Sequence, residues 1–140
     1  MTVEVFKFNI LFYMKIYYAH SIQGAHTEWE RIPSDIIPML QSRWHEVLSE
    51  EIYTSVTILT DEEIYLRDKK MIDECNLILA NLTNPSLWVG YELWYGEAQW
   101  KKIIWFYQWN LKDRVSAMIN GNNNIPVHKI YNIQDLKEII

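Results

Sequence analysis

Short apolar segments alternate along this chain with longer amphipathic segments, and this alternation limits the possible folds more than any other feature. The apolar segments are short and uninterrupted, as in strands that are buried on both faces of a parallel sheet. The amphipathic segments repeat their apolar residues every three or four positions, as helices that cover a sheet do. We therefore expect a single-domain α/β fold that is doubly wound (Rossmann-like or flavodoxin-like), with a five-stranded parallel sheet flanked by helices.

The same pattern predicts the positions of the elements. Strands are expected at residues 15–19, 76–82, 102–107 and 127–131. Helices are expected from residue 34 or 35 to residue 44, at residues 61–74, from residue 89 or 90 to residue 100, and at residues 133–140. In the helix expected from residue 34 or 35 to residue 44, Pro38 is tolerated only if it lies in the first turn, after a cap at Ser34 or Asp35. Residues 46–59 are ambiguous, because local propensity favours a strand at residues 53–59 and residues 46–49 are the shorter candidate.

Composition excludes several classes of protein. The 140 residues suit one domain, and the net charge of -5 argues against a protein that binds a nucleic-acid backbone, although not against one that binds a single nucleotide. The single cysteine, Cys75, excludes an intrachain disulfide and fits a reducing compartment, so a cytoplasmic location is expected. The histidines have no metal-ligand spacing with Cys75 or the carboxylates, so neither a metal nor another cofactor is expected.

The N-terminal stretch of residues 1–18 is apolar enough to resemble a signal peptide. Lys7, Asn9 and Lys15 interrupt the apolar run, and no small-residue cleavage site precedes a plausible mature start. Residues 1–13 are therefore interpreted as an N-terminal extension, with Met14 as an alternative start, and residues 14–140 as the domain. No membrane association is expected.

Two carboxylates are candidates for chemistry. Ligands of doubly wound sheets bind at the carboxyl ends of the strands, which directs attention to residues 20–24, to residues 81–92 and to the loop after Tyr107. Glu92 follows a buried strand and is expected in the first turn of a helix, where the dipole stabilises an anion; taken alone, it fits an ordinary N-terminal helix charge better. Asp68, flanked by Arg67 and Lys69, fits a solvated charged face equally well. If the two carboxylates converge on one pocket, they suit glycosidic cleavage.

The turn after the first expected strand contains His20, Ser21 and Gly24. Glycine permits close backbone approach, and a hydroxyl with free amides can bind a phosphate. The turn is neither a dinucleotide-binding fingerprint nor a P-loop, and an ordinary polar loop explains it equally well.

Three separated segments, residues 17–24, 85–93 and 116–119, resemble the 2'-deoxynucleoside 5'-phosphate N-hydrolases of the nucleoside 2-deoxyribosyltransferase superfamily. The similarity extends over residues 15–119, and the intervals from Asp68 to Glu92 and from Glu92 to Ser116 also fit. It implies that residues 14–140 form a nucleoside 2-deoxyribosyltransferase-like domain with its second strand at residues 45–50. Residues 53–59 would then form a loop.

The resemblance also implies roles for individual residues. Glu92 would attack C1' of the deoxyribose, Asp68 would protonate or hydrogen-bond the departing base, and Tyr17 would hold the Glu92 carboxylate in place. Ser116 would reach the phosphate of a neighbouring subunit, which implies a homodimer. The implied substrate- and phosphate-binding residues are His20, Ser21, Ile22, Gln23, Gly24, Ser86, Gly90 and Ser116.

Four positions depart from the family pattern. Gln23 stands where an arginine is usual, which removes one cation from the implied phosphate site, and His20 stands where a glycine is common. Trp88 replaces a small residue beside the nucleophile and Trp94 replaces a glycine. Their rings would narrow the pocket, stack on the base or pack against a partner subunit.

Three functions follow in order of preference. The first is hydrolysis of the N-glycosidic bond of 2'-deoxynucleoside 5'-monophosphates, which yields free base and 2-deoxyribose 5-phosphate. The second is base exchange by a nucleoside 2-deoxyribosyltransferase, which Gln23 favours and the three serines oppose. The third is a non-catalytic nucleotide-binding protein, which would not need the pair of carboxylates.

Overall fold

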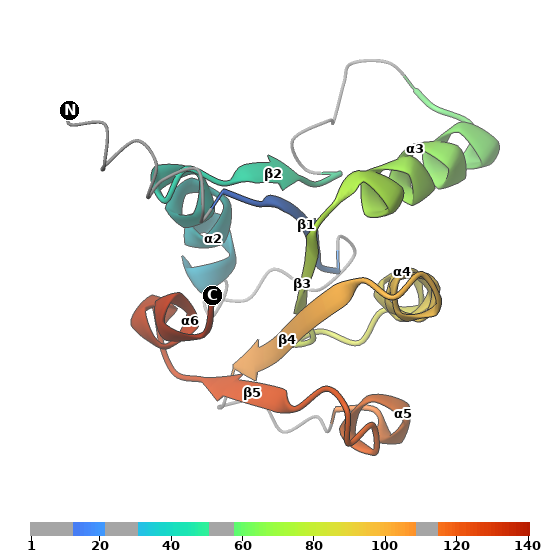
Figure 1. The fold of residues 1–140 in the computed structure, drawn as a ribbon. Helices are drawn as coiled ribbons and strands as arrows, with labels where there is room; N and C mark the ends of the chain where they lie inside the picture. The colour runs from blue at the N-terminus through green and yellow to red at the C-terminus, as the bar shows by residue number, and fades with distance from the viewer. Residues whose placement is uncertain (1–12, 22–30, 51–57, 109–114) are drawn as a thin grey trace.

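The computed structural model describes residues 13–21, 31–50, 58–108 and 115–140, and these form a sheet between two layers of helices (Figure 1). The strands are β1 (Lys15–Ala19), β2 (Glu46–Leu48), β3 (Leu77–Asn81), β4 (Lys102–Gln108) and β5 (Val127–Ile130). The helices are α2 (Arg31–Ser42), α3 (Asp61–Glu74), α4 (Leu87–Ala98), α5 (Ala117–Asn120) and α6 (Ile133–Ile139). Within these ranges no helix has both the length and the apolar character that crossing a bilayer requires.

All strand pairs in the described sheet are parallel, and the strand order is β2-β1-β3-β4-β5. The order reverses at β1, whose two neighbours are β2 and β3. The doubly wound prediction is confirmed, and so is the placement of the second strand before Glu50. A ligand site is expected at this switch point, beyond the carboxyl ends of β1 and β3.

The strands bury both faces, and alternate residues point to opposite helix layers. Figure 1 shows α2 and α6 on one face of the sheet and α3, α4 and α5 on the other. Ile16 and Tyr18 pack in the cluster that includes α2 and α6, whereas Tyr17 and Ala19 pack in the cluster that includes α3 and α4. The period of two in β1 therefore places the Tyr17 ring on the face covered by α3 and α4.

Two predicted helix starts are wrong. The structure has α2 from Arg31, so Ser34 and Asp35 lie inside the helix and Pro38 is in its interior. Burial of residues such as Ile36 and Leu40 against the sheet stabilises α2 despite the proline. The structure has α4 from Leu87, three residues earlier than Gly90, because the preceding serine accepts a hydrogen bond from a first-turn amide.

Helices α2 and α4 are each followed by a tryptophan with an unusual backbone conformation. Trp44 and Trp100 have positive φ angles of 69° and 58°, the conformation that usually carries glycine after a helix. At each end three consecutive backbone amides return to the last turn, as when Lys101 donates to the Gly96 carbonyl at 3.0 Å. These hydrogen bonds stop both helices at the amino-terminal edge of the sheet, away from the expected ligand edge.

Helix α4 contains two glycines that differ in their surroundings. A Cβ at Gly96 would overlap with the Ile78 side chain of β3, which is fully buried, whereas a Cβ at Gly90 would meet no atom within 4 Å. Gly96→Ala is expected to lower the free energy of unfolding by about 1–2 kcal/mol because the buried Ile78 side chain or the helix must shift to admit the methyl group. Gly90→Ala is expected to raise it by about 0.5–1 kcal/mol because alanine favours the helix. Chemical denaturation of the two variants checks both signs, and a destabilised Gly90→Ala would contradict the open surroundings of that residue.

Candidate active site

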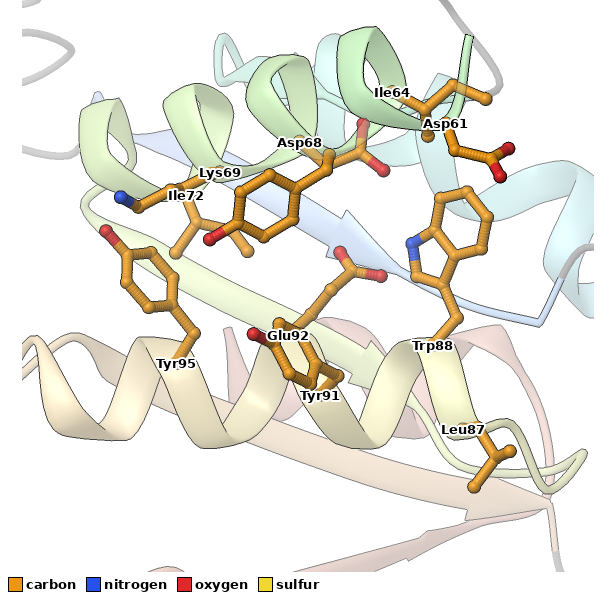
Figure 2. Close-up of a pocket in the computed structure, with 11 residues that line it drawn as sticks. Asp61, Ile64, Asp68, Lys69, Ile72, Leu87, Trp88, Tyr91, Glu92 and Tyr95 are labelled. Atoms are coloured by element: carbon orange, nitrogen blue, oxygen red, sulfur yellow. The ribbon is translucent and has the colours of Figure 1, made fainter.

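A cavity of about 410 Å³ lies between α3 and α4. The two catalytic candidates face each other across it, because Glu92 projects from α4 towards α3 and Asp68 projects from α3 towards α4 (Figure 2). Most of the remaining wall is aliphatic and aromatic. The lining residues are Asp61, Ile64, Tyr65, Asp68, Lys69, Ile72, Leu87, Trp88, Tyr91, Glu92 and Tyr95.

Helix α3 presents Asp68 to the cavity because of its position on the helix. Thr60 and Glu63 form a capping box that starts α3, with the Thr60 amide donating to Glu63 Oε2 at 2.7 Å. Asp68 then lies three and four residues before Met71 and Ile72, and these spacings share one helix face. The face is buried on the sheet, so Asp68 is only 4% exposed. The alternative of a solvated charge at Asp68 is therefore wrong.

The Glu92 carboxyl group is buried beside two polar side chains. The Tyr17 hydroxyl donates a hydrogen bond to it from β1, while Glu92 Oε2 has no partner among the described residues. Burial raises the pKa of Glu92 to about 8, and the negative charges of Asp68 and Glu50 add to this rise. The Tyr17 hydrogen bond acts in the opposite direction by favouring the carboxylate.

The expected stabilisation of Glu92 by the helix dipole is wrong. Glu92 is the sixth residue of α4 and thus lies in its second turn, beyond the free amides of the N-terminus. Its side chain is 6% exposed, and loss of water has the larger effect on its pKa. The protein therefore holds a carboxyl group that is easily protonated, next to a tyrosine whose own pKa is raised well above its usual value, mainly by burial. Tyr17 consequently stays protonated and acts as a donor.

Two charged residues near the cavity did not emerge from the sequence patterns. Arg67 Nε donates to Asp68 Oδ1 at 2.8 Å, and another guanidinium nitrogen lies 3.2 Å from Glu50 Oε1. Glu50 follows β2, so its position at the carboxyl end of a strand was a usable signal. Arg67 offered none, because it was indistinguishable from the neighbouring basic residues of its helix. Despite this clustering of carboxylates, no group of residues in the described ranges is arranged to hold a metal ion.

The predicted phosphate-binding residues are only partly described. Ser86 caps α4, where its Oγ accepts from the Val89 amide at 3.2 Å. His20 and Ser21 follow β1 at the same sheet edge, and the His20 ring stacks on Tyr18 with centroids 4.7 Å apart. Ile22, Gln23 and Gly24 lie outside the described residues.

Two further predicted binding residues do not line the cavity of a single chain. Gly90 is exposed on the outer side of α4. Ser116 caps α5, where its Oγ accepts from the Met118 amide at 3.3 Å, and its side chain is exposed. The structure therefore brings Tyr17, Asp68 and Glu92 together within one chain and leaves Ser116 apart from them.

The aromatic side chains of α4 divide between the cavity and the surface. Trp88 and Tyr95 line the cavity, and Tyr95 connects the two helices through a 2.5 Å hydrogen bond to Asp73 Oδ1. Trp94, in contrast, is 68% exposed and is not among the lining residues. Of the two tryptophans that depart from the family pattern, only Trp88 is placed to shape the pocket.

Comparison with known proteins places this geometry in a family. No family model matches the chain. A Syntrophotalea carbinolica protein assigned as a 2'-deoxynucleoside 5'-phosphate N-hydrolase is 31% identical over 91% of this chain and 92% of its own length. The 5-hydroxymethyl-dUMP N-hydrolase of Danio rerio is 33% identical over 89% of this chain and 88% of its own length.

Solved structures agree on the fold. A CMP N-glycosidase from Clostridium botulinum has a TM-score of 0.63 at 19% identity, covering 89% of this chain and 96% of that one. A 2-deoxyribosyltransferase from Bacillus psychrosaccharolyticus has a TM-score of 0.65 at 17% identity, covering 88% and 90%. The chain therefore belongs to the 2'-deoxynucleoside 5'-phosphate N-hydrolase family and is an enzyme of the N-glycosidase class.

Proposed function

We propose that this enzyme hydrolyses the N-glycosidic bond of 2'-deoxynucleoside 5'-monophosphates to free base and 2-deoxyribose 5-phosphate, with Glu92 as the nucleophile. The observation that carries the proposal is the buried Glu92 carboxyl at the cavity wall, hydrogen-bonded to Tyr17 and opposite Asp68. One oxygen of each carboxyl group has no partner within the described part of the chain, which leaves it for a bound molecule.

The reaction proceeds in two displacements. In the first, a Glu92 oxygen forms a bond to C1' as the bond from C1' to the base nitrogen breaks, and the electron pair leaves with the base. Asp68 contacts the base and assists its departure by a hydrogen bond or a proton. In the second, a water molecule attacks C1' as the bond from C1' to Glu92 breaks and releases the carboxylate, and the proton that the water loses replaces the one that the base takes up, so that the net reaction adds one water across the glycosidic bond. Tyr17 keeps the carboxylate oriented throughout.

The 5'-phosphate would bind at the sheet edge formed by the turns after β1 and β3. The capping hydroxyl of Ser86 and the first amides of α4 supply donors and the positive end of a helix dipole. Ser21 and His20 follow the neighbouring strand, because Ala19 and Ala80 are partners in the ladder between β1 and β3. Gln23 contributes a neutral side chain at a position where the family usually has a cation, which weakens the electrostatic part of binding.

The preference for a 2'-deoxy sugar follows from the approach of the nucleophile. Glu92 reaches C1' beside the 2' position, where a hydroxyl group would crowd the carboxylate or hydrogen-bond to it. A 2'-hydroxyl would also withdraw electron density from C1', so its absence leaves the positively charged transition state more stable.

We further propose that the enzyme is a cytoplasmic homodimer in which Ser116 of one subunit serves the site of the other. The outer face of α4 exposes large apolar side chains, including Leu87 (96%) and Trp94 (68%), and Met118 beside Ser116 is 82% exposed. A second copy of the chain that packs on these side chains would remove them from solvent.

Mixing two inactive variants tests the shared site. Glu92→Gln and Ser116→Ala subunits are unfolded and refolded together, so that mixed dimers form. One of the two sites in each mixed dimer then has both native residues, and about a quarter of the wild-type activity should return. Sedimentation velocity establishes the dimer independently. A monomer, or a mixture no more active than its components, would contradict this assembly.

The function itself is tested by measuring base release from deoxynucleoside monophosphates, ribonucleoside monophosphates and unphosphorylated deoxynucleosides. Release from the deoxymonophosphates alone supports the hydrolase. Activity only on unphosphorylated deoxynucleosides, increased by a second base, would replace it with base exchange. No release from any member would favour the non-catalytic nucleotide-binding alternative.

A further inference from the structure

Arg67 lies between two carboxylates at the edge of the active site. It donates through Nε to Asp68 Oδ1 at 2.8 Å and approaches Glu50 Oε1 to 3.2 Å. About four-fifths of the arginine and Glu50 side chains is withdrawn from solvent, and Asp68 is more buried still. Buried ion pairs of this kind are strongly sensitive to removal of one partner.

The contact between Arg67 and Asp68 is not a consequence of helix geometry. Consecutive residues on a helix point about 100° apart, so their side chains do not face each other. The guanidinium must bend back across α3 to reach Asp68, and it does so while it also contacts Glu50 from the segment after β2. The contacts of Arg67 with Asp68 and Glu50 therefore restrain the orientation of the Asp68 carboxyl group.

This orientation determines which Asp68 oxygen is free. Oδ1 accepts from Arg67, whereas Oδ2 is buried and has no partner among the described residues. Asp68 lines the cavity, and its carboxyl group points into the space between α3 and α4 (Figure 2). An unrestrained carboxyl could rotate either oxygen into that space or turn towards solvent.

We propose that Arg67 is a positioning residue that holds Asp68 with Oδ2 directed at the leaving base and keeps Glu50 beside it. This rests on the proposed function for the identity of the leaving group. A single guanidinium thereby neutralises part of a group of three carboxylates, Glu50, Asp68 and Glu92, all of which act on the Tyr17 hydroxyl.

The alternative is that Arg67 only ties α3 to the end of β2. In either role the charge of Arg67 acts on Glu92, which is faced by Tyr17 from β1, by Asp68 and Arg67 from α3, and by Glu50 after β2. The positive charge of Arg67 lowers the pKa of Glu92, against the larger effects of burial and of the two other carboxylates. The two roles therefore differ in a variant that keeps the charge: with a lysine at position 67 a purely structural tie would cost stability alone, whereas a positioning residue would also cost rate.

The test compares Arg67→Gln, Arg67→Lys and a control, Lys70→Gln, which removes an exposed positive charge from the same helix. Arg67→Gln should lower kcat/KM about 10- to 100-fold and move the pH midpoint of kcat/KM upward. Arg67→Lys, which keeps the charge and loses the two-pronged geometry, should retain the wild-type midpoint with a reduced rate. Lys70→Gln should leave both kcat/KM and its pH midpoint at the wild-type values.

Two further measurements make the outcome decisive. The titration of the Glu92 carboxyl carbon, followed by carbon-13 NMR and assigned with Glu92→Gln, reports the charge effect of Arg67 without any turnover. Wild-type enzyme that releases no base would count against the proposed function, whereas a wild-type rate in Arg67→Lys would overturn the role of Arg67 in positioning Asp68. Wild-type activity in Arg67→Gln, or a loss that only follows a lower melting temperature, would overturn it as well.

Discussion

Glu92→Gln is expected to lower kcat by about a thousandfold or more while leaving the fold intact. An amide has nearly the same shape as the carboxyl group but cannot form the glycosyl ester. The substitution also suits the site, because the amide oxygen can accept from Tyr17 and the amide nitrogen can donate towards Asp68 Oδ2, which has no partner in the described structure. Turnover is measured as base release under saturating substrate. Activity within tenfold of the wild type would show that Glu92 is not the nucleophile.

Stability measurements provide the control for this variant. The pKa of Glu92 is raised from 4.5 to about 8 in the folded protein, so folding takes up a proton between these values. This group therefore stabilises the fold fully below pH 4.5, and its contribution falls by about 1.4 kcal/mol per pH unit until it is lost above pH 8. Glu92→Gln lacks this titrating group, so its free energy of unfolding should increase relative to that of the wild type as the pH rises. Glu97→Gln, an exposed change on the same helix, should show no such trend.

The overall fold could be predicted because its determinants are local and repetitive. The buried strands are continuous apolar segments, and a parallel arrangement follows once helices separate them. The alternation within β1 also assigns Tyr17 to one face of the sheet. The helix starts were less accurate because caps compete: Ser86 was available before Val89, and packing of Ile36 and Leu40 maintains α2 across Pro38.

The site was predictable only in part, for a physical reason. Asp68 and Glu92 are separated by a strand and a turn, and nothing in their own segments shows that α3 and α4 face each other. The resemblance to a known family supplied that pairing. The Arg67–Glu50 ion pair depends on a long side chain that bends across its helix, and no spacing rule anticipates such a contact.

The environment of Glu92 also differs from the sequence expectation because burial is a tertiary property. A carboxylate near a helix N-terminus is stabilised by the dipole by about 0.3–1 kcal/mol. Loss of hydration outweighs this for Glu92, since its side chain is enclosed by β1, α3 and α4. A catalytic carboxyl with a displaced pKa in a cavity is the common result of such enclosure.

The second large effect expected is a rise in kcat/KM with increasing pH, with a midpoint near pH 8. Glu92 attacks only as the carboxylate, and the carboxyl group with a pKa of about 8 is mostly protonated at pH 6.5. The rate constant should therefore increase about tenfold per pH unit up to the midpoint and level off above it. Measurement between pH 6.5 and pH 9.5 stays above the second ionisation of the substrate phosphate, near pH 6.

Tyr17→Phe connects this profile to the structure. The Tyr17 hydrogen bond is the strongest of the influences that lower the pKa of Glu92. Its removal should move the midpoint to higher pH and reduce kcat/KM most at neutral pH, while the plateau at high pH changes less. A neighbouring control, Tyr18→Phe, alters a ring on the opposite face of the sheet and should leave the midpoint in place.

A falling profile would have a specific meaning. If kcat/KM declined above pH 8, the proton lost there would be one that the reaction uses, and the reactive state would carry it on Asp68 rather than on Glu92. Asp68 would then act as a proton donor to the base. The rising profile is the expected result because Glu92, whose pKa is raised to about 8, attacks only as the carboxylate.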